Sequence, residues 1–184
     1  LRIIPRLNSE YYNFNLEKPP FNDVRVRRAL YLTVDRQLIA QKVLGLRTPA
    51  TTLTPPEVKG FSATTFDELQ KPMSERVAMA KALLKQAGYD ASPLRFELFY
   101  NKYDLHEKTA IALSSEWKKW LGAQVTLRTM EWKTYLDARR AGDFMLSRQS
   151  WDATYNDASS FLNTLKSDSE ENVGHWKNAQ YDAL

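Results

Sequence analysis

Residues 94–130 read LRFELFYNKYDLHEKTAIALSSEWKKWLGAQVTLRTM, and this stretch decides the fold. Its two ends, 94–100 and 124–130, are rich in apolar and β-branched residues and predict strands. Between them Asp104 can cap a helix and Gly122 can end it. The apolar face of that helix consists of Ala110, Leu113, Trp117 and Trp120, which we assign to the core. A strand–helix–strand unit of this length favours parallel strands joined by a right-handed crossover.

The sequence before this unit predicts strands, a turn and a helix. Residues 1–16 alternate and are rich in aromatic side chains, which is typical of one or two strands. Residues 18–23, KPPFND, form a turn because paired prolines exclude a helix. Residues 24–44 then predict a helix in two pieces with a new N-cap at Asp35, ending at Gly45.

Residues 46–72 carry four prolines and predict a long surface loop. We expect the next helix to be capped by Ser74 and to end at Gly88. Beyond the central unit we expect a helix at 132–141, a strand at 144–151, a helix at 159–165 and a last helix capped by Asn178. The predicted class is α/β, a mixed sheet flanked by helices.

Composition excludes several kinds of function. The chain has 184 residues, no cysteine, and 43% hydrophobic against 26% charged residues, which is typical of a globular domain. The net charge of +4 is dispersed apart from the run at 25–28, so we expect no nucleic-acid partner. Glycines never cluster into a phosphate loop, and neither His106 nor His175 has a second metal-binding residue type at ligand spacing. We therefore expect no enzyme, no cofactor and no metal, although the fold could still assemble a carboxylate pair.

Three segments, in order, resemble the oligopeptide-binding family of solute-binding proteins that serve ABC importers. The first is KPPFNDVRVR at 18–27, and its Pro-Phe-x-Asp-x-Arg-Val-Arg pattern is similar to the broad family of peptide- and nickel-type binding proteins. The second runs from Tyr100-Asn101 through Asp104-Leu105-His106 to 117–119. The third runs from 131–134 through Arg139, Arg148 and Trp151 to 160–164, and resembles the subgroup that binds oligopeptides and murein tripeptide.

The resemblance implies a two-lobed protein that encloses its ligand between the lobes. Residues 1–184 would then be a single, C-terminally truncated domain, most of the second lobe. It also implies a periplasmic location, a short peptide or other small solute as ligand, and a membrane ABC permease complex as partner. We expect a monomer.

Residues 144–156 offer what a peptide site needs, which is a cation, polar groups and a strand edge. The candidate ligand-binding residues are Trp132, Arg139, Arg148, Trp151, Asp152, Thr154 and Asn156. For Arg148 the alternative is an internal salt bridge to Asp143 or Asp152, since a charge in an apolar strand must be paired. Arg139 could equally be a surface residue, and each tryptophan could be core. For the ligand reading, we expect Arg139, Arg148, Trp132 and Asp152 to converge on one open concave surface.

One position departs from the family pattern. Peptide-binding relatives carry an aspartate for the peptide's ammonium where this sequence has Thr154. Residues two apart in a strand point to the same side, so Asp152 could replace that carboxylate from one pleat away. Two hypotheses follow: Asp152 anchors a peptide, or the scaffold binds a non-peptide, anionic solute through Arg139 and Arg148. A chaperone-like interaction module is a third possibility.

Overall fold

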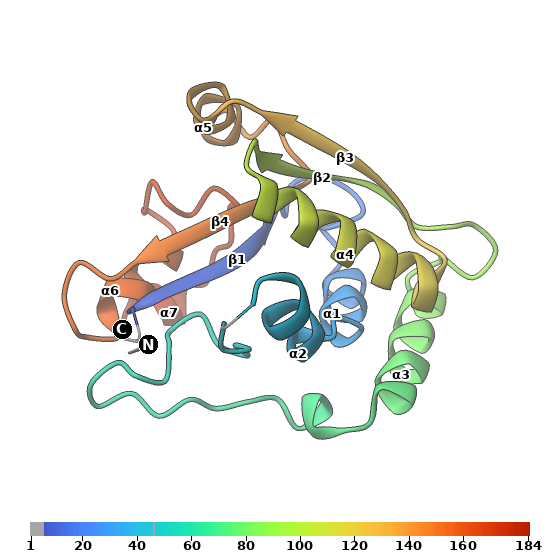
Figure 1. Cartoon of the computed structure of the whole chain (residues 1–184), viewed down its shortest axis with the longest axis horizontal. Helices are drawn as coiled ribbons and strands as arrows, with labels where there is room; N and C mark the ends of the chain where they lie inside the picture. Colours follow the sequence, from blue (N-terminus) through green and yellow to red (C-terminus); the bar gives the residue numbers. More distant parts are fainter. Residues whose placement is uncertain (1–5, 46) are drawn as a thin grey trace.

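The computed structural model describes residues 6–45 and 47–184, and its centre is a four-stranded sheet in the order β1-β4-β2-β3 (Figure 1). The strands are β1 (Asn8–Phe14), β2 (Arg95–Asn101), β3 (Gln124–Met130) and β4 (Leu146–Asp152). β2 runs parallel to both β3 and β4, whereas β1 runs antiparallel to β4. The predicted mixed sheet and the parallel β2–β3 pair are confirmed.

Helices lie on both faces of this sheet. They are α1 (Val24–Leu32), α2 (Arg36–Leu38, continued by a π-helical turn at Ile39–Val43), α3 (Met73–Gln86), α4 (Asp104–Leu121), α5 (Trp132–Arg140), α6 (Ser159–Leu162, continued by a 3-10 turn at Asn163–Leu165) and α7 (Ala179–Asp182), with a 3-10 turn at Asp67–Gln70. Figure 1 shows α1, α3 and α4 on one side of the sheet and α5 on the other. We call these the α4 face and the α5 face. None of the described helices is long and apolar enough to cross a membrane.

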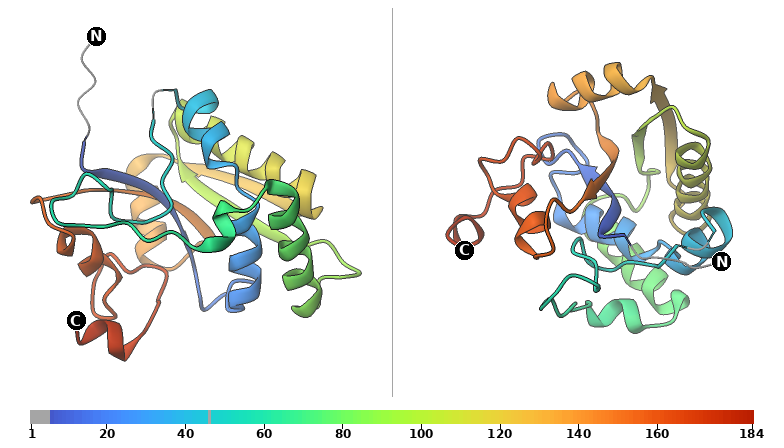
Figure 2. Two further views of the ribbon diagram at one scale, coloured as in Figure 1. Left: turned by 90° about the horizontal axis from the view of Figure 1, so that it is seen from below. Right: turned by 60° about the vertical axis from the view of Figure 1, so that its left-hand side comes forward.

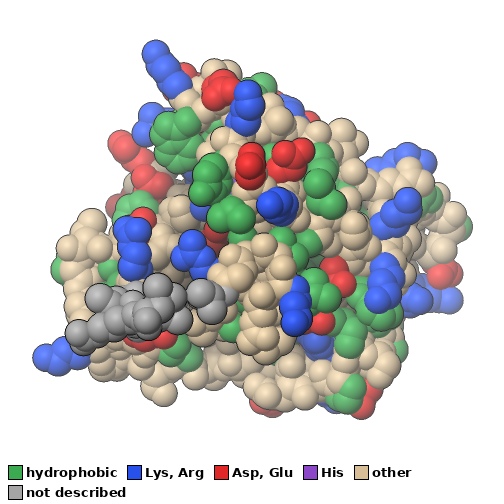
Figure 3. Space-filling model, viewed as in Figure 1, with side chains coloured by type: hydrophobic (Ala, Val, Ile, Leu, Met, Phe, Trp, Pro, Cys, Tyr) green, Lys and Arg blue, Asp and Glu red, His purple; other side chains and the backbone are tan. Residues whose placement is uncertain are grey.

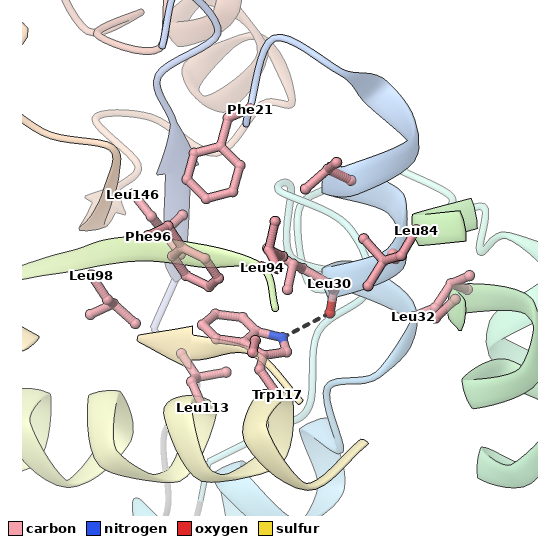
Figure 4. Close-up of a cluster of buried hydrophobic side chains, with 14 of the residues drawn as sticks. Phe21, Leu30, Leu32, Leu84, Leu94, Phe96, Leu98, Leu113, Trp117 and Leu146 are labelled. Atoms are coloured by element: carbon pink, nitrogen blue, oxygen red, sulfur yellow. Dashed lines mark hydrogen bonds between the residues drawn. The ribbon is translucent and has the colours of Figure 1, made fainter. Parts of the chain in front are cut away.

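The main core lies on the α4 face. Phe96 and Leu98 of β2 are buried against Trp117 of α4, and the Phe96 and Trp117 ring centroids lie 5.5 Å apart. The Trp117 indole N–H donates a 3.1 Å hydrogen bond to the Leu30 carbonyl of α1 (Figure 4). This bond satisfies the one polar atom of a side chain that is 3% exposed, so Trp117 joins α1, α4 and the sheet.

A smaller core lies on the α5 face. It consists of Phe99, Tyr135, Phe144 and Val173. Because Leu98 and Phe99 are neighbours in β2, their side chains point to opposite faces of the sheet. Val173 brings the segment after α6 onto this face beside α5. Figure 2 shows that the segment 159–184 lies beside β1 and β4, away from α3.

Several predicted boundaries need correction. Ser74 does not cap α3, which begins at Met73 after Pro72, a residue whose fixed φ suits a helix start. Asp104 is the first residue of α4 and not its N-cap, which is Tyr103. The strand expected at 144–151 is Leu146–Asp152.

Other predictions are confirmed, and some lie outside the described residues. The caps at Asp35 and Asn178 form as predicted, with side-chain oxygens accepting backbone N–H groups. The residues 1–5 of the first expected strand, and Leu46 in the long loop, are outside the described residues. Trp120 is only half-buried and lies outside the core, where its ring is covered by the Lys119 ammonium at 4.1 Å, so its assignment to the core is wrong.

The order of the connections indicates where a fold of this kind would hold a ligand, beside β2, and we call this place the crevice. From β2 the chain crosses the α4 face to reach β3, and from β3 it returns across the α5 face to β4 on the other side of β2. The direction of the connections therefore reverses between β2 and β4. In α/β sheets, ligands bind outside the carboxyl ends of the strands at such a reversal.

Candidate functional site

The carboxyl-terminal half of β4 has an open edge. β4 pairs with β2 only at Leu146 and Ser147, whereas its pairing with β1 continues to Asp152. In Figure 1 the arrowheads of β2 and β4 diverge. Among the residues that the structure describes, no strand therefore pairs with 148–152 on the β2 side.

The hydrogen bonds show which backbone groups of β4 face this opening. The Asn15 N–H donates to the Met145 carbonyl at 2.9 Å, and the Ala153 N–H donates to the Leu7 carbonyl at 2.8 Å. Odd-numbered residues of β4 thus exchange hydrogen bonds with β1, and even-numbered residues direct their backbone groups away from it. Of these, the Arg148 carbonyl accepts the Tyr135 hydroxyl. The backbone groups of Ser150 and Asp152 are therefore directed to the side where another strand could pair with β4.

On the α4 face, the open edge carries an ion pair. The Arg148 guanidinium lies 3.4 Å from the Glu10 carboxylate of β1, and the Arg148 side chain is only 9% exposed. Among the described residues, its Nε has no hydrogen-bond partner, nor does the buried Asn101 side-chain oxygen at the end of β2. Buried polar atoms are normally satisfied, so unpaired ones at a crevice indicate a place where a ligand can bind.

His106 and the start of α4 lie beside Arg148. The His106 Nδ1 lies 3.3 Å from the Asn101 carbonyl, and the Tyr103 ring contacts the imidazole. In the part of the chain that the structure describes, no side chain caps the amino terminus of α4, and a free helix amino terminus attracts anions. Together with Arg148, these groups suit a carboxylate.

His106 predicts a pH dependence of stability. Burial, together with the nearby Arg148 charge, lowers the pKa of His106 below its ordinary value of 6.5. The unfolded chain then binds more protons than the folded one, so this group's contribution is fully present above pH 6.5 and is lost as the pH falls through the lowered pKa. We expect His106→Asn to flatten the acid side of the profile of Tm against pH, measured by circular dichroism. An unchanged profile would contradict this reading of the His106 environment.

On the α5 face, the centre of the polar cluster is Arg139, in the last turn of α5. Arg139 is 6% exposed, and its guanidinium donates to the Gln149 side-chain oxygen. The same oxygen accepts the Asn13 amide, and the Gln149 amide donates to Glu171 at 3.1 Å. Burial lowers the pKa of Arg139 and raises the pKa of the neighbouring Tyr11 to about 12. Arg139 is thus an interior charge and not a surface one.

The other predicted residues border the open edge or follow it. Trp132 is 54% exposed at the start of α5 and stacks on Tyr135. The half-buried Trp151 donates its indole N–H to the Ser160 carbonyl at 2.6 Å. Asp152 is exposed and lies 3.1 Å from Arg6. In the loop after β4, the Thr154 hydroxyl is 3.3 Å from that of Ser160, and the Asn156 side chain accepts the Lys59 backbone N–H.

Two expectations about these residues are wrong. They do not converge on one concave surface, because Arg148 and Asp152 lie on the α4 face whereas Arg139 and Trp132 lie on the α5 face. For Arg148 the structure shows the alternative, an internal salt bridge, although its partner is Glu10 in place of Asp143 or Asp152. Asp152 and Thr154 are not two residues of one strand, because β4 ends at Asp152.

Two residues of the crevice were missed by the sequence reasoning. Glu10 is in a strand that pairs with β4 across more than a hundred residues of sequence, and nothing local signals that pairing. His106 stands in the second motif that resembles the family, and its place at the start of a helix following a strand was the available signal.

Two hollows of the surface lie away from these residues. One of about 660 Å³ is at the amino ends of β2 and β3, lined in part by Arg95 and Gln124. Another of about 490 Å³ lies beside Gly142 and His175. Neither is lined by Arg139 or Arg148. In the described ranges, no three His, Asp or Glu side chains gather as metal ligands.

Comparisons with known proteins agree with this geometry. Residues 2–172 match the family model of "Bacterial extracellular solute-binding proteins, family 5 Middle". The chain is 46% identical to the periplasmic oligopeptide-binding protein OppA of Salmonella typhimurium, covering 100% of this chain and 34% of the relative. It is 44% identical to the periplasmic murein peptide-binding protein MppA of Escherichia coli, covering 98% and 34%.

Solved structures give the same result. The structure of the Escherichia coli murein tripeptide-binding protein MppA matches with a TM-score of 0.93 and 42% identity, over 97% of this chain and 36% of that one. Haemophilus influenzae OppA in complex with the peptide RPPGFSPFR matches with a TM-score of 0.93 and 39% identity, over 97% and 36%. The chain spans about a third of the length of these relatives. The family consists of solute-binding proteins and not of enzymes, and this chain belongs to it: it is a member of family 5 of the bacterial extracellular solute-binding proteins.

Proposed function

We propose that this chain is most of one lobe of a two-lobed periplasmic protein that captures short peptides and delivers them to an ABC importer. The relatives that support this are named for oligopeptide or murein peptide binding, and the chain spans about a third of their length. The remaining length leaves room for a second lobe to close over the crevice. In this proposal the protein binds and releases its ligand and catalyses no reaction.

The observation that carries the proposal is the open edge of β4. An extended peptide can add to such an edge as a further strand, with main-chain hydrogen bonds that do not depend on its sequence. Ser150 and Asp152 offer those bonds, since their backbone groups point away from β1. A binding protein for peptides of varied sequence needs recognition of this kind.

Arg148 is the group that we assign to the ligand's carboxylate. It is buried beside the open edge, and the amino terminus of α4 and His106 lie on the same face. Without ligand, Glu10 balances its charge at 3.4 Å. A bound carboxylate would fill the hydrogen-bonding position that the Arg148 Nε leaves unused, and charge-assisted bonds of this kind are among the strong ones.

Asp152 is the group that we assign to the peptide's ammonium. It lies at the far end of the open edge from Arg148, on the same face. Its present partner is Arg6, and both side chains are more than half exposed. An exposed ion pair contributes only about 0–1 kcal/mol, so an ammonium can replace Arg6 at little cost.

We expect Asp152→Ala to weaken the binding of a free tripeptide by the full-length protein at least tenfold, because it removes the carboxylate from the end of the edge. Isothermal calorimetry measures the change. An N-acetylated peptide, which has no ammonium, is the control and should bind both proteins alike. Unchanged affinity for the free tripeptide would reject the role of Asp152.

A non-peptide, anionic solute is the second candidate. It is favoured by the neutral surroundings of Thr154, whose hydroxyl lies beside the Ser160 hydroxyl and provides no charge for an ammonium. An interior arginine beside β4, either Arg148 on the α4 face or Arg139 on the α5 face, would then bind the anion. Micromolar binding of ordinary di- to pentapeptides by the full-length protein would reject this candidate.

Native mass spectrometry of the full-length protein, purified without denaturation, tests the proposed function directly. We expect bound species with the masses of short peptides. A uniform non-peptide mass would favour the anionic solute. A third outcome is that the protein binds no solute and instead associates with unfolded chains through an apolar patch. This outcome would favour a chaperone-like module and overturn the proposal.

A further inference from the structure

We propose that the free edge of β3 is a docking surface for an extended, acidic segment of a partner protein. The inference goes beyond the proposed function, because it concerns a different strand from β4 and does not depend on which solute the protein binds. Its basis is a row of outward backbone groups on β3 that begins beside a positively charged hollow.

The backbone of β3 is used on one side only. β3 is the last strand of the sheet, and among the strands that the structure describes it pairs with β2 alone. The Gln124 N–H donates to the Leu94 carbonyl at 2.8 Å, and the Met130 carbonyl accepts the Lys102 N–H at 2.8 Å. Even-numbered residues of β3 therefore bond to β2, and odd-numbered residues direct their N–H and carbonyl groups away from it.

We call the outward backbone groups of Val125, Leu127 and Thr129 the β3 edge. A row of this kind is a template on which another chain can pair as a further strand. Prolines, bulges and very short strands are common ways of blocking such pairing. β3 contains seven residues and no proline, and it stays in register with β2 along its whole length. The β3 edge is thus regular enough to accept an added strand.

A hollow at the amino ends of β2 and β3 adds positive charge to one end of this edge. It has a volume of about 660 Å³, and Gln124, Val125 and Thr126 of β3 line it. Arg95 and Lys118 line it as well. Across the described ranges 6–45 and 47–184, no carboxylate lies within 4.0 Å of either cation. Both charges are therefore available to a partner.

The carboxylate that lines the hollow is already paired. Glu97 lies 3.4 Å from the Arg128 guanidinium, which also lies 3.4 Å from Asp143. The lining thus keeps an excess of positive charge, and Phe96 and Met145 give it apolar walls. Glutamate combines an alkyl stem with a carboxylate and matches both features. Because complementary charges favour association and like charges oppose it, the hollow favours an acidic segment.

A second copy of this chain matches the hollow less well. The sequence of β3, QVTLRTM, contains no acidic residue and one arginine. Two copies paired through β3 would therefore offer no carboxylate from either strand to Arg95 or Lys118. An acidic segment of another protein supplies both the strand and the missing charge.

Docking on β3 leaves the crevice free. β2 stands between β3 and β4, and the hollow is at the amino ends of the strands, whereas the crevice is at their carboxyl ends. Figure 1 shows β3 at the outer border of the sheet, on the opposite side from β1. A partner can therefore bind while a solute occupies the crevice, and the two kinds of binding can be measured separately.

The test uses the full-length protein saturated with a tripeptide, so that the crevice is occupied. The probe is a labelled hexapeptide of alternating glutamate and valine with both ends blocked, and fluorescence anisotropy measures its binding. We expect it to bind at least about tenfold more tightly than the same peptide with glutamine for glutamate. The preference should shrink as salt is added. Equal binding of the two probes, or no binding of the glutamate probe, overturns the inference.

Two variants assign the binding to the β3 edge and its hollow. Thr129→Pro removes one outward N–H and leaves the hydrogen bonds to β2 in place, so the probe should bind at least about tenfold more weakly. Thr129→Ala keeps the N–H and is its matched control. Lys118→Glu should have a similar effect and serves if the proline variant fails to fold, whereas Lys119→Glu alters a residue outside the lining. A probe that binds folded Thr129→Pro and Lys118→Glu as tightly as the unmodified protein overturns the inference.

Hydrogen exchange and sedimentation distinguish this partner from two other occupants of the edge. In the free full-length protein we expect the amides of Val125, Leu127 and Thr129 to exchange fast and those of Thr126 and Arg128 slowly. Slow exchange of the outward amides would show that the rest of the chain covers the edge. A dimer that Thr129→Pro dissociates would show that a second copy does. Either result overturns the inference.

Discussion

Replacing Arg148 by methionine should weaken the binding of a free tripeptide to the full-length protein by about 100-fold or more. Losing one partner of a buried, hydrogen-bonded charge pair costs about 2–5 kcal/mol, and each 1.4 kcal/mol is a factor of ten. Methionine keeps much of the arginine's length and leaves Glu10 partly in contact with solvent, so the fold should persist. Calorimetry measures the affinity and circular dichroism the fold.

The control for this change is Arg128→Met on β3. That arginine has a side chain 24% exposed and makes two ion pairs, but it lies away from the open edge. We expect it to lower stability and leave affinity within a few fold. If Arg148→Met binds the tripeptide as tightly as Arg128→Met does, Arg148 does not contact the carboxylate. A C-terminally amidated tripeptide should lose little affinity in the Arg148 variant, because it brings no carboxylate.

The central part of the fold could be predicted because its signals are local. The segment 94–130 contains its own strand, helix and strand, and the observed β3 matches the predicted range at both ends. The turn at 18–23 and the cap at Asp35 likewise depend on neighbouring residues. Local propensity and side-chain periodicity are sufficient for such elements.

The site could be predicted only in part, because it depends on pairing over long distances in sequence. Arg148 and Arg139 were named, but their partners Glu10 and Gln149 follow from the register between β1 and β4 and from where α5 docks. A shift of one residue in that register would move each side chain of β4 to the opposite face. No feature of the sequence within either strand fixes that register.

The distribution of charged side chains on the surface bears on the expectation that this chain has no nucleic-acid partner. Figure 3 shows Lys and Arg side chains spread over one face of the molecule with Asp and Glu between them. Many of these charges form exposed pairs, among them Lys102 with Glu131 and Lys85 with Asp90. On this face the positive charges are therefore not gathered into one unbroken basic surface of the kind that a polyanion binds.

Trp117→Ala should destabilise the lobe more than any other change considered for this chain. Truncating a buried tryptophan costs about 3–5 kcal/mol, and a domain has only about 5–15 kcal/mol in total. Trp117 is 3% exposed, packs on Phe96 and donates to the Leu30 carbonyl, so its loss opens a cavity and removes one hydrogen bond between α4 and α1. We expect a large fall in Tm, and fast hydrogen exchange in β2 and α1 of the full-length protein.

The matched control is Trp120→Ala, three residues along the same helix. Trp120 is half-buried, its ring contacts the Lys119 ammonium, and it lies outside the main core. Surface contacts of this kind contribute about 0.5–1 kcal/mol, so the variant should stay close to the unmodified protein in Tm and in peptide affinity. Equal destabilisation by the two changes would contradict the packing described for α4. The two tryptophans share the apolar spacing of one helix face, but only Trp117 is buried against β2. A difference of several kcal/mol between the two variants would show that this burial decides which tryptophan stabilises the lobe.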